Sequence, residues 1–124
     1  MSRPTITQLG RALRAREVSS RELVTAALAR IEALDGSLNS FITVEPALAL
    51  AAADRADQQL ARGEGGPLTG IPFAHKDIFC TAGVRTTCAS KMLADFVPPY
   101  DATVVSRLAA AGIVMLGKTN MDEF

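Results

Sequence analysis

The run at residues 113–116, Ile-Val-Met-Leu, is apolar throughout and directly follows the glycine expected to end a helix. Such a run is typical of a strand buried on both faces. An earlier segment, residues 71–78, is rich in β-forming residues and leads into an irregular loop. Between the two, Asp101 is a candidate N-cap for a helix that stops at Gly112. Strand, crossover helix and strand form a βαβ unit, whose right-handed connection makes the two strands parallel.

Two capping boxes predict helices in the first part of the chain. Thr5 with Gln8 opens a short helix. Ser19 with Glu22 opens a longer helix, in which apolar residues recur at helical spacing. We expect this second helix to stop at residues 35–36, Asp-Gly, where the glycine can adopt a left-handed conformation.

The remaining signals before the core concern one extended segment and a third helix. Residues 39–44 carry β-branched and aromatic residues and predict a short extended segment. Pro46 suits the first turn of an alanine-rich helix that runs through Ala61 and is closed by the glycines within 63–66. Gly10, inside the first helix, is expected to cost about 1 kcal/mol relative to alanine.

These elements predict an α/β protein with a parallel or mixed sheet. A helical segment, residues 1–63, precedes the start of an α/β core, residues 64–124. A parallel sheet needs several strands and helices on both faces, whereas only two core strands are evident. We therefore expect residues 1–124 to be the N-terminal part of one larger domain. In isolation such a piece would expose a sheet edge, which favours aggregation.

Composition excludes several classes of function. The 13 basic and 13 acidic residues cancel and are interspersed, so a phosphate-binding stripe for nucleic acid is not expected. The uncharged stretches, such as 65–75 and 108–117, are shorter than the roughly 20 apolar residues that span a bilayer. The first residues lack the apolar region of a signal peptide. We expect a cytoplasmic protein in which Cys80 and Cys88 are reduced.

Two patterns suggest sites that the sequence itself argues against. His75, Cys80 and Cys88 match no common zinc spacing, so buried thiols and a satisfied histidine are the favoured interpretation. Residues 112–119 fit the phosphate-loop pattern G-x-x-x-x-G-K-[ST]. A phosphate loop must follow a strand and open a helix, but here a helix precedes and the four middle residues are apolar. The pattern is better explained as the second strand, with ATP–Mg²⁺ binding as an alternative.

Lys76 lies at the end of the first core strand, where a lysine is most often simply an exposed charge. Because side chains alternate along a strand, His75 and Asp77 are expected on one face and Lys76 on the other. A lysine desolvated at that position would release its proton more easily and could act as a general base.

Four blocks along the chain closely resemble the start of the amidase signature family. They are residues 66–77 (GPLTGIPFAHKD), 86–88 (TTC), 101–105 (DATVV) and 117–124 (GKTNMDEF). Within that family, His-Lys-Asp at 75–77 and the closing Asn-Met-Asp-Glu-Phe most resemble the A subunits of bacterial glutamyl-tRNA(Gln)/aspartyl-tRNA(Asn) amidotransferases.

The resemblance implies a Ser, cis-Ser, Lys triad in which the lysine is Lys76. The lysine would act as base through a bridging serine, the nucleophilic serine would attack the amide of glutamine, and water would hydrolyse the acyl-enzyme. Backbone N–H groups of a Gly/Ser-rich segment would hold the oxyanion. In these amidotransferases the A subunit passes the ammonia to a partner subunit. The partner uses ATP and Mg²⁺ to amidate glutamate or aspartate misacylated on tRNA. The implied assembly is a heterotrimer with B and C subunits, and no cofactor is expected in this chain.

Both serines lie beyond Phe124 in relatives, so residues 1–124 alone are expected to be inactive. Ser90 and Ser106 are not in a Gly/Ser-rich segment and are not candidates. A general amidase of the same family is the main alternative. A non-enzymatic interaction segment is another, built on the amphipathic helices at 19–35 and 46–62. The sequence does not decide between glutamine and asparagine tRNA.

Overall fold

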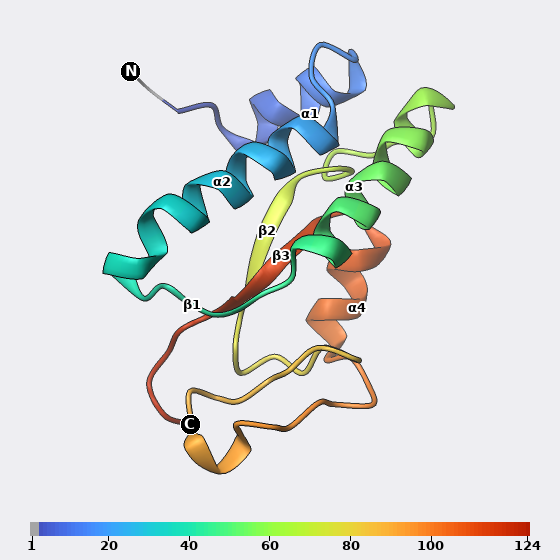
Figure 1. The fold of residues 1–124 in the computed structure, drawn as a ribbon. Coiled ribbons are helices and arrows are strands. Elements are labelled where there is room, and N and C mark those ends of the chain that lie inside the picture. Colours follow the sequence, from blue (N-terminus) through green and yellow to red (C-terminus); the bar gives the residue numbers. More distant parts are fainter. Residues whose placement is uncertain (1–2) are drawn as a thin grey trace.

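The computed structural model describes residues 3–124, which form helices around a small mixed sheet (Figure 1). The elements in chain order are α1 (Ile6–Arg14), α2 (Ser20–Leu38), β1 (Phe41–Val44), α3 (Pro46–Ala61), β2 (Pro72–Lys76), the 3₁₀ turn η1 (Lys91–Leu93), α4 (Thr103–Ala110) and β3 (Val114–Thr119). The α/β class is thus confirmed, as are both capping-box helices and the proline-initiated third helix.

β3 is the central strand of the sheet, in the order β1-β3-β2. It runs parallel to β2, as the βαβ unit predicts, and antiparallel to β1. β1 is the extended segment expected within residues 39–44, so the first 63 residues contribute a strand to the core that follows them.

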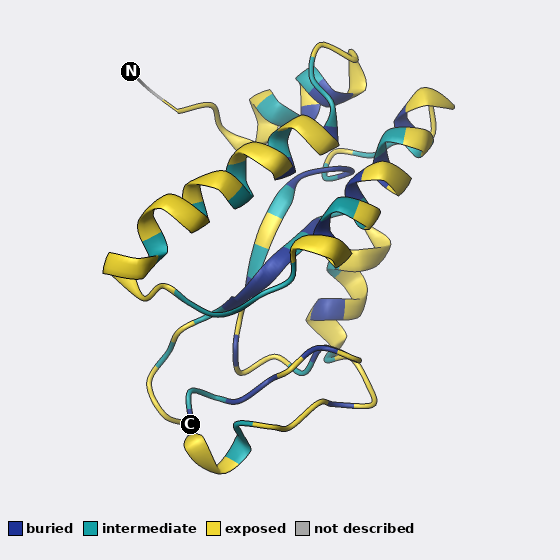
Figure 2. Ribbon diagram, viewed as in Figure 1, coloured by how far each residue is buried: buried dark blue, intermediate teal, exposed yellow. Residues whose placement is uncertain are grey.

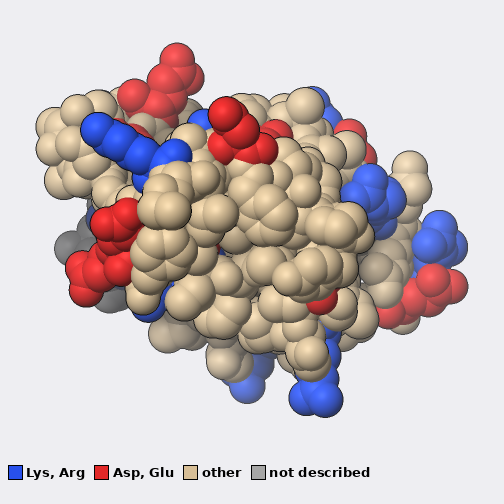
Figure 3. All heavy atoms as spheres, turned by 90° about the horizontal axis from the view of Figure 1, so that it is seen from below, with Lys and Arg blue, Asp and Glu red and all other residues tan. Residues whose placement is uncertain are grey.

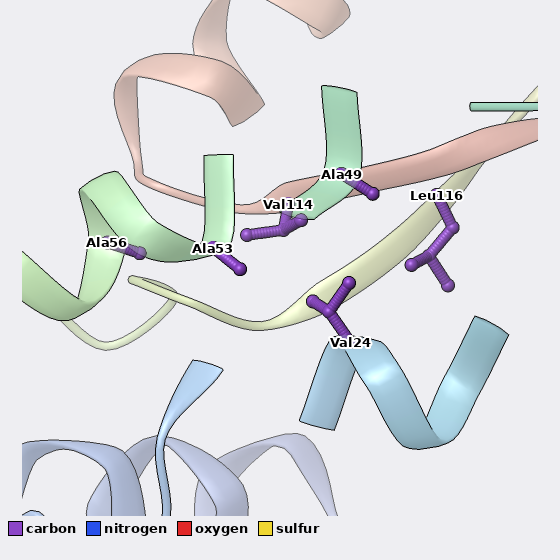
Figure 4. Packing of buried hydrophobic residues seen from close by; sticks show 6 residues of the cluster. All are labelled: Val24, Ala49, Ala53, Ala56, Val114 and Leu116. Atoms are coloured by element: carbon purple, nitrogen blue, oxygen red, sulfur yellow. The ribbon is translucent and has the colours of Figure 1, made fainter. Parts of the chain in front are cut away.

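The main core lies between β3 and the helices α2 and α3 (Figure 4). Its buried members are Val24, Ala49, Ala53, Ala56, Val114 and Leu116. The alanines have no bulk beyond Cβ, so α3 can pack close to the strand. Figure 2 shows β3 as the most continuously buried strand, with the outer faces of α2 and α3 exposed. The apolar stripes of these two helices therefore pack on their own domain, as the simpler explanation of their pattern predicted.

The end of α2 differs from the prediction. Gly36 is helical, the helix continues to Leu38, and the left-handed residue is Asn39, with a φ of 53°. The Asp35 carboxylate accepts a hydrogen bond from the backbone N–H of Ser40 at 2.7 Å. Asp35 thus supports the turn after the helix end instead of marking the end itself, and asparagine tolerates the left-handed conformation that closes it.

The predicted cap of α4 is wrong as well. Ala102 is the N-cap, and it makes no side-chain capping bond. The Asp101 carboxylate instead accepts from the backbone N–H of Ala82 at 2.7 Å. A contact with a loop distant in sequence has replaced the local one. The predicted stop is right, since Gly112 follows the helix with a φ of 92°.

The presence of glycine at position 10, inside α1, is explained by packing and not by helix propensity. A Cβ at this position would lie 2.6 Å from the carbonyl oxygen of Pro67. Glycine therefore lets α1 pack directly against the backbone of the loop before β2, which the expected propensity cost did not anticipate.

Gly117 is needed for the pairing of β1 with β3, and alanine there is expected to destabilise the fold by about 2 kcal/mol through overpacking. A Cβ would overlap the carbonyl oxygen of Thr43 and lie 3.0 Å from Cα of Val44. Both are backbone atoms, so no rotamer change relieves the clash. Denaturant-induced unfolding measures the loss. The control is Gly36→Ala, in a helix with nothing within 4 Å of its Cβ, which is expected to stabilise by about 0.5–1 kcal/mol. An unchanged unfolding midpoint for Gly117→Ala would contradict this strand pairing.

Basic and acidic side chains are interspersed on the molecular face drawn in Figure 3, where neither sign forms a continuous stripe. None of the helices in residues 3–124 is both long and apolar enough to cross a membrane.

Candidate active site at the carboxyl end of β2

Lys76 is the last residue of β2, and its side chain is exposed. Its neighbours His75 and Asp77 are buried, so the predicted alternation holds. Lys76 pairs with Thr119, the last residue of β3. The carboxyl ends of these parallel strands therefore meet at one edge, which is where open α/β sheets bind ligands. The desolvation that a basic lysine requires is not provided by the described residues.

Lys118 is fully buried on β3, next to this edge. Its Nζ donates hydrogen bonds to the carbonyl oxygen of Phe79 at 2.6 Å, to Oγ1 of Thr81 at 2.9 Å and to Oγ1 of Thr86 at 3.0 Å. Sequence reasoning considered this lysine only as part of a phosphate-loop pattern. The available signal was its position at the end of an apolar strand, opposite a threonine-rich loop.

Asp77 completes the buried group around Lys118. Its Oδ2 accepts hydrogen bonds from the backbone N–H and the hydroxyl of Thr87, at 2.9 and 2.5 Å. Its Oδ1 lies 3.7 Å from Nζ of Lys118 and makes no hydrogen bond. Burial lowers the pKa of Lys118, and the negative charge of Asp77 opposes that shift. We call Asp77, Thr81, Thr86, Thr87 and Lys118 the Lys118 cluster.

The geometry also rules out a phosphate loop at residues 112–119. The strand predicted at residues 113–116 is present, but it begins at Val114 and continues to Thr119, so it includes Lys118. The ammonium of Lys118 is enclosed by protein oxygens and lies 3.7 Å from a carboxylate. It is therefore not available to bind phosphates, which need an exposed cation and a flexible turn.

The other residues considered as nucleophiles or metal ligands are Cys80, Cys88 and Ser90. Cys80 and Cys88 are free thiols, as expected, but both are half-buried and not buried as predicted. Residues 3–124 contain no group of three or more histidine, cysteine or acidic residues able to hold a metal. The hydroxyl of Ser90 donates to Oε1 of Glu123 at 2.8 Å, which joins the loop to the segment after β3.

His75 borders a cavity of about 370 Å³ between α3, α4 and the sheet. Only 3% of the residue is exposed, and its ring stacks edge-on against Phe73 with centroids 5.2 Å apart. Burial lowers the pKa of His75, the positive charge of Lys118 lowers it further, and Asp101 partly opposes both. The imidazole is therefore held neutral.

Stability is expected to fall on acidification because of His75. Its folded-state pKa lies below the ordinary 6.5, so the unfolded chain takes up the proton first and stability decreases as pH falls below 6.5. The slope reaches about 1.4 kcal/mol per pH unit between the two pKa values. Thermal unfolding at pH 7.5 and 5.5 measures it, with His75→Gln as the non-titrating comparison. Equal losses in both proteins would show that His75 is not the cause.

Comparison with known proteins agrees with this architecture. Residues 22–124 match the family Amidase, so the chain belongs to the amidase family. It is 62% identical over its whole length to a protein from Alkalilimnicola ehrlichii named as the A subunit of glutamyl-tRNA(Gln) amidotransferase, and 64% identical to one of the same name from Methylococcus capsulatus. In both cases it covers 26% of the relative.

A solved structure shows the same fold. The chain is similar to the native peptide amidase from Stenotrophomonas maltophilia, with a TM-score of 0.92 and 38% sequence identity. The match covers 98% of this chain and 26% of that one. The chain thus spans about a quarter of the length of the relatives it matches.

Proposed function

We propose that this chain is part of the A subunit of a tRNA-dependent amidotransferase and that the whole subunit hydrolyses glutamine to supply ammonia. The observation that carries the proposal is the difference in identity. The chain is 62–64% identical along its whole length to proteins of that name, against 38% for the peptide amidase of the same fold. A general amidase is the second candidate, which the structural match to the peptide amidase favours.

In the proposed chemistry Lys76 is the base of a Ser, cis-Ser, Lys triad. Neutral Lys76 takes a proton from the bridging serine, which takes one from the nucleophilic serine as that oxygen attacks the side-chain amide carbon of glutamine. The C–N bond then breaks, and ammonia leaves with a proton returned through the same path. Water hydrolyses the resulting ester to glutamate. Support comes from the place of Lys76, exposed at the carboxyl end of β2 and free to meet residues from elsewhere in the protein.

The proposal includes partners and a location. B and C subunits would complete a heterotrimer, and a partner subunit would use ATP and Mg²⁺ to transfer the ammonia to glutamate or aspartate misacylated on tRNA. The assembly would act in the cytoplasm, where thiols such as Cys80 and Cys88 remain reduced.

The direct test is release of glutamate and ammonia from glutamine by the full-length protein, alone and with its B and C subunits. A C-terminal peptide amide serves as the competing substrate. We expect glutamine hydrolysis that rises when the complex and misacylated tRNA are present. Hydrolysis of the peptide amide without hydrolysis of glutamine would instead establish a general amidase. Residues 1–124 alone, lacking both proposed serines, are expected to hydrolyse neither.

A further inference from the structure

We propose that the Lys118 cluster positions Lys76 for catalysis, so that Lys118, although fully buried, is a positioning residue of the active site. The inference rests on the proposed function, in which Lys76 is the base. It assigns a role to a buried cation that the chemistry above does not use.

The first argument is connectivity. Asp77 is covalently next to Lys76, and its backbone N–H donates to the carbonyl oxygen of Thr119 at 3.1 Å. The Lys76 carbonyl accepts from the N–H of Phe79, also at 3.1 Å. Lys118 then binds the Phe79 carbonyl from the adjacent strand. The backbone from Lys76 onward is thus held at Lys76, Asp77 and Phe79.

The second argument is the division between the faces of β2. Lys76 is exposed, whereas Asp77 and Lys118 are completely buried. Alternation therefore separates a side chain available for chemistry from the buried groups that hold its backbone in place. Rigid support of this kind is what a catalytic side chain requires, because its position must be kept within a fraction of an ångström.

The third argument is the strained loop that the cluster holds. Cys88 and Ala89, directly after Thr87, have φ values of 52° and 54°. Two consecutive non-glycine residues in the left-handed region are costly, and such strain persists only where surrounding contacts enforce it. Here the contacts are those of Asp77, which accepts two bonds from Thr87 and one, through its carbonyl, from the N–H of Cys88 at 3.1 Å. The cluster thus fixes this loop and the end of β2 together.

The test uses the full-length protein with Asp77→Asn and Lys118→Met combined, which removes both charges and leaves no buried ion unpaired. We expect kcat for glutamine hydrolysis to fall by about a hundredfold, the loss typical of a displacement of about 1 Å, with KM within about twofold. The acid limb of the pH profile of kcat should also shift. Lys91→Met is the matched control, because Lys91 is an exposed lysine in the segment between β2 and α4. It should leave kcat, KM and the pH profile of kcat unchanged.

A second readout does not depend on activity. Brief treatment with acetic anhydride over a range of pH, followed by peptide mass spectrometry, measures the reactivity of Lys76 relative to that of a lysine-containing peptide added as a standard. The double variant should change this ratio. A folded double variant with wild-type kcat, pH profile and Lys76 reactivity overturns the proposal.

Three further outcomes also have a defined meaning for the proposal. If the double variant does not fold, Thr87→Val removes a single hydroxyl of the cluster, and a changed or unchanged Lys76 reactivity then supports or overturns the inference. If Lys76→Ala retains full glutamine hydrolysis, the role of Lys76 as the base is wrong, whereas a wild-type protein that hydrolyses no glutamine contradicts the proposed function. The labelling ratio still shows whether the cluster positions Lys76.

Discussion

Replacing Lys76 by alanine is expected to lower kcat for glutamine hydrolysis by the full-length protein about a thousandfold, the scale of a lost general base. Lys76→Arg should be almost as inactive. A guanidinium keeps the positive charge but does not give up its proton at accessible pH, so it cannot act as a base. Steady-state release of ammonia measures both variants.

Within residues 1–124 the side chain of Lys76 is exposed at a strand end and contributes little to folding. Both substitutions made in residues 1–124 should therefore change the free energy of unfolding by less than about 0.5 kcal/mol. Lys91→Ala, on another exposed lysine, is the control and should retain full activity. Near-normal activity of Lys76→Arg would mean that the residue acts through its charge and not as a base.

Replacing Lys118 by methionine is expected to cost about 3–5 kcal/mol of stability, because it leaves the buried carboxylate of Asp77 without a compensating charge. Both side chains are fully buried, and Nζ lies 3.7 Å from Oδ1. The loss would also remove the donor shared by Phe79, Thr81 and Thr86. Denaturant-induced unfolding monitored by circular dichroism measures the change.

The double variant separates the two sources of this loss. Asp77→Asn with Lys118→Met leaves no unpaired charge, and replacing a buried ion pair by neutral groups of similar size is often well tolerated. We expect it to lose less than half as much stability as Lys118→Met. A single variant that costs less than about 1 kcal/mol would indicate that water or rearrangement solvates Asp77.

The elements with strong local signals were predicted well from the sequence. Capping boxes placed the starts of α1 and α2 correctly, and the apolar run after Gly112 correctly indicated β3 parallel to β2. These features depend on residues close together in the chain. The two wrong boundaries, at residues 35–36 and at Asp101, both involve carboxylates that bind backbone groups outside a helix, in the following turn for Asp35 and in a more distant loop for Asp101. Local pattern alone does not distinguish a cap from such a contact.

The candidate site was likewise predicted only in part from the sequence. Lys76 and the alternation of its neighbours follow from strand geometry and from the family resemblance. The Lys118 cluster does not, because it joins residues 77–87 to a lysine far later in the chain, and no sequence pattern fixes those distances. The exposure of Lys76 agrees with the usual state of a lysine at a strand end, whereas the desolvation also considered for it depends on what covers the sheet edge and is not provided by the described residues.

The central place of β3 has a consequence for synthesis of the protein. Within the part of the chain that the structure describes, β1 and β2 pair with β3 and not with each other. β3 is also the last of the three strands to be made. On the ribosome, Phe41–Val44 and Pro72–Lys76 therefore emerge without a partner and must wait, open to chaperones or to misassociation, until Thr119 has left the exit tunnel.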